Sequence, residues 1–236
     1  MTRPTPRRAA ASSVAVPEAG APADARERLL QAAIEILATD GDRGFKVLEV
    51  ARRAGTNVAL INYHFGGRAG LVAEAVRRTG IELAQVRAMR LEALLAAAAP
   101  AAPALPALVR CWLEPVFDSV CRQDRAGLLM LTAHLAFAAE LDAPAKEDMV
   151  RDILAVDRLF VDELARCLPA LSRSAIAWRL SAAVGSYCFV LGEREAISWR
   201  ASTGGRPPDF AEAYEELVVF VIGGLMAPAA MSCGPF

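Results

Sequence analysis

The sequence predicts an all-α protein, and three observations support this fold class. Alanine, leucine, arginine and glutamate, all good helix formers, dominate the 236-residue chain, which is 55% hydrophobic and 6% aromatic. Apolar residues recur with helical spacing over most of the length. No segment alternates polar and apolar residues as a half-buried strand would. We therefore expect about nine helices and no sheet.

The net charge of −1 is the sum of two unlike parts of the chain. The first 80 residues hold 12 basic and 8 acidic side chains, for a net charge of +4, whereas the remainder holds 14 basic and 19 acidic ones, for −5. A basic N-terminal end beside an acidic body favours an anionic partner at that end only.

The compartment can be predicted from exclusions. No apolar segment follows the N-terminal arginines, so the chain lacks a secretory signal. No uncharged run reaches the roughly 20 continuous apolar residues that a membrane span needs. Five cysteines without a C-x-x-C pair indicate reduced thiols, and two histidines are too few for an ordinary zinc site. We expect a cytoplasmic protein with no membrane partner, metal or cofactor.

The first 70 residues contain a disordered arm followed by three helices. Residues 1–23 have almost no large apolar side chain and predict the arm. The first helix should begin at Asp24, with Glu27 completing a capping box, and end at the glycines at 41 and 44. A tight turn at Gly55–Asn57 separates short helices over Val47–Ala54 and Val58–His64. Two short helices around such a turn form a helix-turn-helix pattern.

The rest of the chain continues with helical spacing. A long helix should run from Arg68 to about Ala98, where prolines at 100–106 break it. Pro144 suits a first helical turn, and Asp209 suits an N-cap. The other expected helices are Leu108–Cys121, Arg125–Leu141, one after Pro144 that carries Met149 to Leu164, Ile176–Leu191 and Phe210–Leu225.

A family becomes recognisable between Arg28 and Val76. The motif residues are Arg28-Leu29-Leu30-x-Ala32-Ala33, Gly41, Val50-Ala51-x-x-Ala54-Gly55 and Ile61-x-x-His64-Phe65-x-x-Arg68-x-x-Leu71. Their spacing over about 50 residues resembles the DNA-binding domain of the TetR family of bacterial transcriptional regulators. The segment Asn62-Tyr63-His64-Phe65-Gly66 is similar to one branch of that family, in which some regulators respond to fatty acids or their acyl-CoA esters.

Three positions depart from the common family pattern. Phe45 and Lys46 stand where a threonine or serine usually caps the second helix. Asn62 replaces the usual tyrosine, as in the branch just named, and Arg68 replaces the usual lysine while keeping its charge. Lys46 can replace a capping hydroxyl as a phosphate contact, although it cannot accept a hydrogen bond from the helix.

The third helix should divide into a core face and an outward face. Val58, Ile61 and Phe65 share the core face, so Leu60 and Tyr63 should point outward. A recognition helix reads base edges with its N-terminal residues, and polar or basic neighbours contact phosphates. The candidate DNA-binding residues are Lys46, Thr56, Asn57, Val58, Ala59, Leu60, Asn62, Tyr63, His64 and Arg68.

Several of these residues have an alternative, purely structural role. Asn57 suits an N-cap, a base contact or both. His64 either closes its helix or contacts a phosphate, and Tyr63 is either a packing aromatic or a DNA contact. The arm arginines Arg3, Arg7 and Arg8 either stay solvated or touch phosphates.

The C-terminal two-thirds contains no acid–base pair or metal cluster, so we do not expect an enzyme. Aromatic and histidine side chains there either form core or line a pocket for a small apolar effector. The cysteines are more typical of small buried hydrophobes than of a redox sensor. The candidate pocket residues are Trp112, Phe117, His134, Phe137, Trp178 and Tyr187.

The resemblance implies a homodimer in which the last two helices of each subunit form a four-helix interface. It also implies a palindromic DNA operator and an effector-binding domain, with fatty acyl compounds as first candidates. The expected domains are 1–23 arm, 24–70 helix-turn-helix, 71–227 ligand-binding and dimerisation, and 228–236 tail. The candidate interface residues are Ile176, Leu180, Val184, Phe210, Tyr214, Leu217, Val221 and Leu225.

Two hypotheses from different classes follow. The first is a sequence-specific DNA-binding regulator, in the form of a repressor released by an apolar effector. The alternative is a helical carrier or binding protein for an apolar small molecule, without specific DNA binding. Selection from random DNA duplexes separates them, because only the regulator has a sequence preference.

Overall fold

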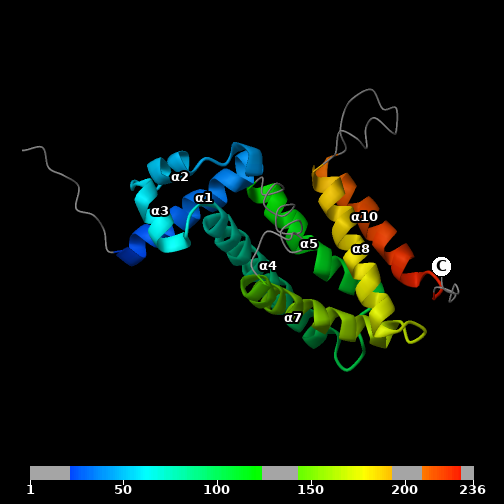
Figure 1. Ribbon diagram of the computed structural model, residues 1–236. Helices are drawn as coiled ribbons and strands as arrows, with labels where there is room; N and C mark the ends of the chain where they lie inside the picture. The colour runs from blue at the N-terminus through cyan, green and yellow to red at the C-terminus, as the bar shows by residue number, and fades with distance from the viewer. Residues whose placement is uncertain (1–21, 124–142, 193–208, 230–236) are drawn as a thin grey trace, which may run out of the picture.

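The computed structural model describes residues 22–123, 143–192 and 209–229, and this part of the chain contains eight helices and no strand (Figure 1). The all-α prediction is therefore confirmed. The predicted helix over Arg125–Leu141 and residues 1–21 of the predicted arm lie outside the described residues, whereas residues 22 and 23, which the prediction placed in the arm, belong to the first helix. The helices are α1 (Pro22–Gly44), α2 (Val47–Arg53), α3 (Val58–Phe65), α4 (Arg68–Ala98), α5 (Leu105–Gln123), α7 (Ala143–Cys167), α8 (Arg173–Gly192) and α10 (Phe210–Met226).

The start of α1 differs from the prediction. The helix already includes Pro22, whose fixed φ suits a first turn, so Asp24 lies inside the helix and cannot be its N-cap. Its carboxylate instead accepts a hydrogen bond from Arg28, one turn later. An acidic side chain in the first turn still interacts favourably with the helix dipole.

The N-terminal core is formed by α1, α2, α3 and the first turns of α4. Leu29, Leu30, Ile36 and Leu37 of α1 are fully or almost fully buried, because apolar residues at helical spacing share one face of the helix. The same cluster includes buried residues from the three following helices, which are Val50, Ala51, Ile61, Leu71, Val72, Ala75 and Val76.

Helix α4 joins this core to a second one. Its 31 residues give a length of about 45 Å, and it packs against α1 and α3 near its start and against α5 and α7 further along. Leu91, about five and a half turns after Leu71, already belongs to the second core. Any change in the direction of α4 is therefore felt in both cores.

The second core lies between α5, α7, α8 and α10. Trp112 and Leu113 of α5 and Phe160 of α7 are buried at its centre. In Figure 1, α8 and α10 lie side by side at the end of the molecule away from α1–α3, and the two helices are in contact. Helix α10 begins as predicted, because the Asp209 carboxylate accepts a hydrogen bond from the Glu212 amide at 2.8 Å.

Helix α8 is unusually apolar on all sides. Residues Arg173–Leu191 are long and apolar enough to cross a membrane by length and composition alone, and 28% of this segment is buried in the chain. A single such helix is weak evidence for a membrane span. One face of α8 packs in the second core, and the other carries exposed apolar side chains.

Candidate nucleic-acid interface

The turn between α2 and α3 is held by four local features. Ala54 caps the end of α2, and Gly55 adopts φ +62°, a left-handed conformation that glycine tolerates at little cost. The Thr56 amide donates to the Ala51 carbonyl at 2.9 Å. Asn57 Oδ1 then accepts from the Leu60 amide at 3.2 Å and starts α3. The prediction that Asn57 is an N-cap is confirmed.

Arg28 of α1 fixes this turn from the side. Its Nε donates to the Ala54 carbonyl at 3.0 Å, so a side chain from α1 satisfies the end of α2. The sequence marks Arg28 only as part of a motif, and no spacing rule assigns it to a carbonyl 26 residues away. The contact holds the turn, and hence the start of α3, against α1.

Helix α3 presents one buried and one exposed face. Ile61 is completely buried, and Val58 and Phe65 are half-buried against the N-terminal core, as predicted. Leu60 is also half-buried against that core, so the prediction that it points outward is wrong. Residue 60 lies at the edge of the apolar stripe, where helical spacing alone does not decide the direction.

The exposed face of α3 is polar and contains one large ring. The Tyr63 side chain is 80% exposed, and Asn57, Ala59 and Asn62 are exposed around it. A tyrosine ring this exposed contributes little to the core, so the packing alternative for Tyr63 is not supported. The face offers hydrogen-bonding groups and one methyl to an external surface.

His64 lies between these two faces. Its ring contacts the Tyr63 ring edge-on, with centroids 4.9 Å apart, and its Nε2 is buried without a hydrogen-bond partner. In this conformation Nε2 is turned away from solvent, so it is not positioned to reach a phosphate. The helix itself is closed by Gly66 at φ +69°, whose amide donates to the Asn62 carbonyl.

The connection from α3 to α4 is tight. A Cβ on Gly70 would lie 1.8 Å from the Phe65 carbonyl oxygen, so no other residue fits there without moving the backbone. The end of α3 and the first turn of α4 therefore approach each other closely. The position of α3 is thus coupled directly to that of α4.

Two cations stand at the starts of neighbouring helices. Lys46 is exposed at the N-cap of α2 and makes no side-chain capping bond, as its replacement of a hydroxyl predicted. Arg68 is exposed at the start of α4, with its guanidinium 5.3 Å from the ring centre of Phe45. This contact brings the two helix starts together. Leu48 of α2 is 72% exposed and is not among the candidate DNA-binding residues predicted from the sequence.

The remaining charges of α2 are largely compensated within the helix. Glu49 accepts hydrogen bonds from Arg52 at 2.7 and 2.8 Å and from Arg53 at 3.1 Å. These bonds hold the pKa of Glu49 at about 2, below its ordinary value of 4.5. The charges of Arg52 and Arg53 are therefore partly neutralised by Glu49. Lys46 lies at the other end of the helix, at its N-cap.

Comparison with known proteins identifies the family. Residues 29–75 match the model of bacterial regulatory proteins of the tetR family, and residues 110–224 match the tetracyclin repressor-like C-terminal domain. The two matched segments together span more than half of the chain. The chain belongs to the TetR family. It is a DNA-binding transcriptional regulator with a helix-turn-helix domain and a ligand-binding C-terminal domain, which accords with the expectation that it is not an enzyme.

Solved structures share the fold of this TetR regulator at low sequence identity. A protein described as a tetR family transcription regulator from Shewanella sp. PV-4 is 12% identical, with a TM-score of 0.57 over 84% of this chain and 96% of that one. A TetR transcriptional regulator from Rhodococcus sp. RHA1 is 16% identical, with a TM-score of 0.52 over 87% and 98%. No curated protein matches the sequence.

The predicted effector-pocket residues of the regulator do not form one group. Trp112, Phe117 and Tyr187 are buried in the second core, with the Trp112 and Tyr187 ring centres 6.0 Å apart. Trp178 is 76% exposed on α8, so its assignment to the same pocket is wrong. It was misplaced because α8 is apolar on every face. His134 and Phe137 lie outside the described residues.

Most of the predicted dimer-interface residues are buried in their own chain. Ile176, Leu180, Leu217, Val221 and Leu225 are at most 6% exposed, so these five are not on the surface that would meet a second copy. Helical spacing finds an apolar stripe but does not tell a core stripe from an interface stripe. Val184, Phe210 and Tyr214 are only partly buried, and their place in a dimer interface stays a prediction.

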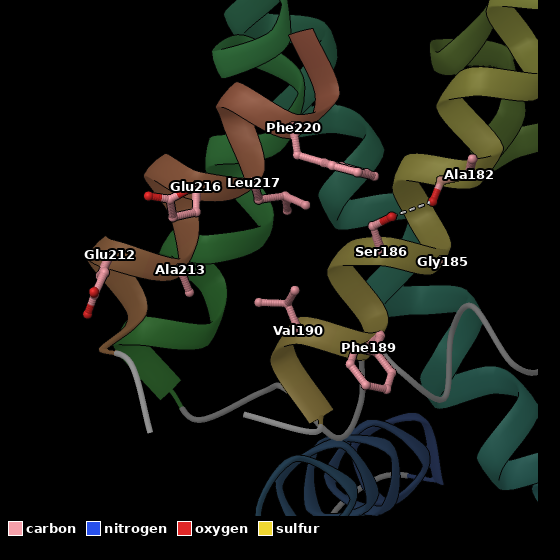
Figure 2. Close-up of a pocket in the computed structure, with 10 residues that line it drawn as sticks. All are labelled: Ala182, Gly185, Ser186, Phe189, Val190, Glu212, Ala213, Glu216, Leu217 and Phe220. Carbon is pink, nitrogen blue, oxygen red and sulfur yellow. Dashed lines mark hydrogen bonds between the residues drawn. The ribbon is translucent and has the colours of Figure 1, made fainter. Parts of the chain in front are cut away.

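The opposite faces of α8 and α10 are exposed and apolar. Trp178 and Phe189 of α8 and Val219, Phe220 and Met226 of α10 are all more than 40% exposed. A surface groove of about 700 Å³ lies between the helices. Phe220 and Val190 extend into it (Figure 2). The Ser186 hydroxyl is turned back to the Ala182 carbonyl at 2.9 Å (Figure 2). The groove wall is therefore mostly apolar.

Two further site classes can be tested against the structure. Among the described residues, no group of three or more histidine, cysteine or acidic side chains could hold a metal ion. Burial raises the pKa of the Cys111 thiol, and it raises that of Cys188 to about 11. A thiol is reactive as the thiolate, so both cysteines are poor candidates for a redox sensor.

Proposed function

We propose that this regulator is a repressor that binds a palindromic operator as a homodimer and leaves it when a small apolar effector binds the C-terminal domain. The observation that carries the DNA-binding part is the exposed face of α3. Asn57, Ala59, Asn62 and Tyr63 lie on that face, and the helix behind them is anchored by buried Ile61.

The residues of this face divide into two roles. Ala59, near the N-terminus of α3, allows close approach to base edges, and Asn57 and Thr56 offer polar groups beside it. Lys46, Tyr63 and Arg68 contact phosphates and fix the register of the helix in the groove. Asn62 completes the exposed set. His64 packs against the Tyr63 ring, and half-buried Val58 and Leu60 support the helix from behind.

The exposed faces of α8 and α10 form the homodimer interface in this proposal. The groove between them, with apolar side chains on both helices, fits the same helices of a second copy. A two-fold axis there places two α3 helices on one side of the dimer. Helices spaced by roughly 34–36 Å would read two half-sites one DNA turn apart.

The effector acts through α4. This helix begins directly after α3, and its far half lies in the second core. A ligand that shifts α4 by a small amount changes the spacing of the two α3 helices. A coupling free energy of about 1–3 kcal/mol is enough to change operator occupancy substantially. By its branch resemblance, the effector is a fatty acyl compound encountered in the cytoplasm.

Selection from random DNA duplexes tests the proposal. We expect a palindromic consensus and an affinity that falls steeply with salt. Tyr63→Ala together with Arg68→Ala should weaken binding to the selected site by roughly 10- to 100-fold at fixed salt. Arg166→Ala, an exposed arginine on α7, is the matched control and should leave the affinity unchanged.

Two outcomes would contradict the proposal in different ways. Unchanged specific binding by the Tyr63/Arg68 variant would overturn the assigned face, whereas no sequence preference at all would favour the alternative of an apolar carrier. Release of the operator is measured with a panel of fatty acids and their acyl-CoA esters. If no member of the panel releases the protein, the effector assignment is wrong.

A further inference from the structure

The second core contains a buried cation. Arg87 of α4 is only 4% exposed and lies in the part of the helix that packs against α5 and α7. A charged group in such surroundings loses its hydration and must be compensated by hydrogen bonds or an opposite charge. Neither DNA binding by α3 nor contact between α8 and α10 of two copies requires an arginine at this position.

Arg87 is compensated on one side only. Its Nε donates to the Trp112 carbonyl at 2.9 Å, and its guanidinium stacks 4.5 Å from the Trp112 ring centre. Nη1 lies 3.4 Å from Asp157 Oδ1, which is long for a charge-assisted bond. The same Asp157 oxygen also accepts from Trp112 Nε1 at 3.0 Å. The carboxylate is therefore shared, and it compensates Arg87 weakly.

The other side of the guanidinium is poorly compensated. Nη2 of Arg87 is buried and has no hydrogen-bond partner of ordinary geometry. Tyr187 of α8 lies close to Arg87. Burial raises the pKa of Tyr187 to about 12, although the positive charge of Arg87 and its hydrogen bond to the Tyr187 hydroxyl oppose that rise. The hydroxyl thus stays protonated at neutral pH and can donate.

We propose that Arg87 and Tyr187 bind the carboxylate of an apolar acid within the second core. Arginine matches a carboxylate with two parallel N–H···O bonds, and a planar acid supplies the acceptors that Nη2 requires. The ring of Trp112 and the apolar residues of the core around it suit the hydrocarbon part of the same molecule. The inference rests on the proposed function, because it names the chemical class of the effector.

The position of Arg87 explains how binding of such a ligand would affect the DNA-binding face. Arg87 follows Arg68 on the same helix, at a distance along the axis of about 28 Å. Arg87, Trp112 and Tyr187 come from α4, α5 and α8, so the bound acid is contacted from three helices. Its binding tightens these helices around α4, whose first turn packs tightly against α3.

Fluorescence of Trp112 provides the direct test. In the full-length chain, Trp178→Phe and Trp199→Phe leave Trp112 as the only tryptophan, with the guanidinium against its ring. Hexanoate, decanoate and palmitate are titrated against decanol and methyl decanoate. We expect at least one acid to bind at least about tenfold more tightly than the neutral compounds, because only the acid gains charge-assisted hydrogen bonds.

Substitutions then assign the preference to Arg87. Arg87→Met should abolish the preference for the acid over the alcohol, and Arg87→Lys should restore part of it. Tyr187→Phe should reduce it. Asp157→Asn should strengthen acid binding, because it removes the competing carboxylate but keeps an acceptor for Trp112. Arg90→Met, one turn further along α4 in surface ion pairs, is the control.

Each result decides the inference. It is overturned if no acid binds, if acids and neutral compounds bind equally, or if Arg87→Met keeps the preference. Should Arg87→Met fail to fold by circular dichroism, weaker acid binding by Asp157→Asn overturns it instead. Operator binding with release by neutral compounds alone would leave the proposed function intact and refute this inference. Acid binding without any preference for a DNA sequence would support this inference and refute the proposed function.

Discussion

Asn57 has a structural task before any DNA is bound. Its side chain caps α3, and the same residue is a candidate for DNA contact. At the residue scale, affinity and stability are therefore mixed in one side chain, and a loss of DNA binding on substitution would not by itself prove a contact. Separating the capping role from DNA contact requires a substitution at position 57 that still caps the helix, and a control substitution at a neighbouring residue that does not cap it.

Asn57→Ala should lower the free energy of unfolding by about 0.5–2 kcal/mol, because the Leu60 amide loses its acceptor. Asn57→Asp should retain most of the stability, since a carboxylate also caps and interacts well with the helix dipole. Urea denaturation measures both. Asn62→Ala, exposed on the same helix, serves as the control, and an equal loss there would contradict the capping role.

Glu49 should show an acid-sensitive interaction. Its pKa of about 2 lies below the ordinary 4.5 because Arg52 and Arg53 donate to the carboxylate. A lowered pKa means that the stabilising effect is complete above pH 4.5 and is lost as the pH falls toward 2. Carbon NMR titration of the Glu49 carboxyl should give the low value. Replacing both arginines by glutamine should return it toward 4.5, and a normal pKa in the unaltered protein would refute the pairing.

At the scale of elements, α8 and α10 are joined through one arginine. Arg179 of α8 donates to four carbonyls at the end of α10, namely those of Gly224, Leu225, Ala227 and Pro228, at 2.8–3.0 Å. A cation at a helix C-terminus also interacts favourably with the dipole. Arg179 thus fixes the end of α10 relative to α8.

Arg179→Ala should destabilise the protein by about 1–3 kcal/mol, because the charge-assisted bonds to these carbonyls are lost. The stability of Arg179→Lys should lie between that of Arg179→Ala and that of the unaltered protein, since lysine keeps the charge but not the planar guanidinium. Hydrogen exchange should locate the loosened amides at the end of α10. If both variants match the unaltered protein in urea denaturation, the bonds contribute nothing to stability.

At the scale of the whole molecule, the exposed apolar faces of α8 and α10 require a cover. Isolated exposed apolar residues are common, but a mostly apolar groove between two adjacent helices, here with Glu212 and Glu216 in its lining, marks an interaction surface. In the proposed homodimer, this surface is buried against its own copy, and the dimer sets the spacing of the two DNA-binding faces.

Phe220→Asp should convert the homodimer to a monomer without unfolding it, because Phe220 is 63% exposed in the single chain. Analytical ultracentrifugation should give 25.1 kDa for the variant and about twice that mass for the unaltered protein. Operator affinity should fall with the loss of the dimer. The control is Leu159→Asp, on the exposed side of α7, which should remain dimeric. If the Phe220→Asp variant is still a dimer, the proposed interface is wrong.

The sequence predicted local structure well wherever the determinants are close in the chain. The bounds of α4 and the caps at Asn57 and Asp209 follow from side-chain chemistry within a few residues. The start of α1 was misjudged because Asp24 suits both a cap and a first turn. The outward face of α3 was predicted from helical spacing, with Leu60 as the exception at its edge.

The sequence by itself determined the helices, the helix-turn-helix and its family, because periodicity, caps and motif spacing are properties of short segments. Only the tertiary structure decided which face of each apolar helix is core. On α8 and α10, both faces carry large apolar side chains, and packing against α5 and α7 chose one face of each as core. It likewise brought Arg87 to Trp112, Asp157 and Tyr187, since residues up to 100 positions apart meet only when four helices pack together.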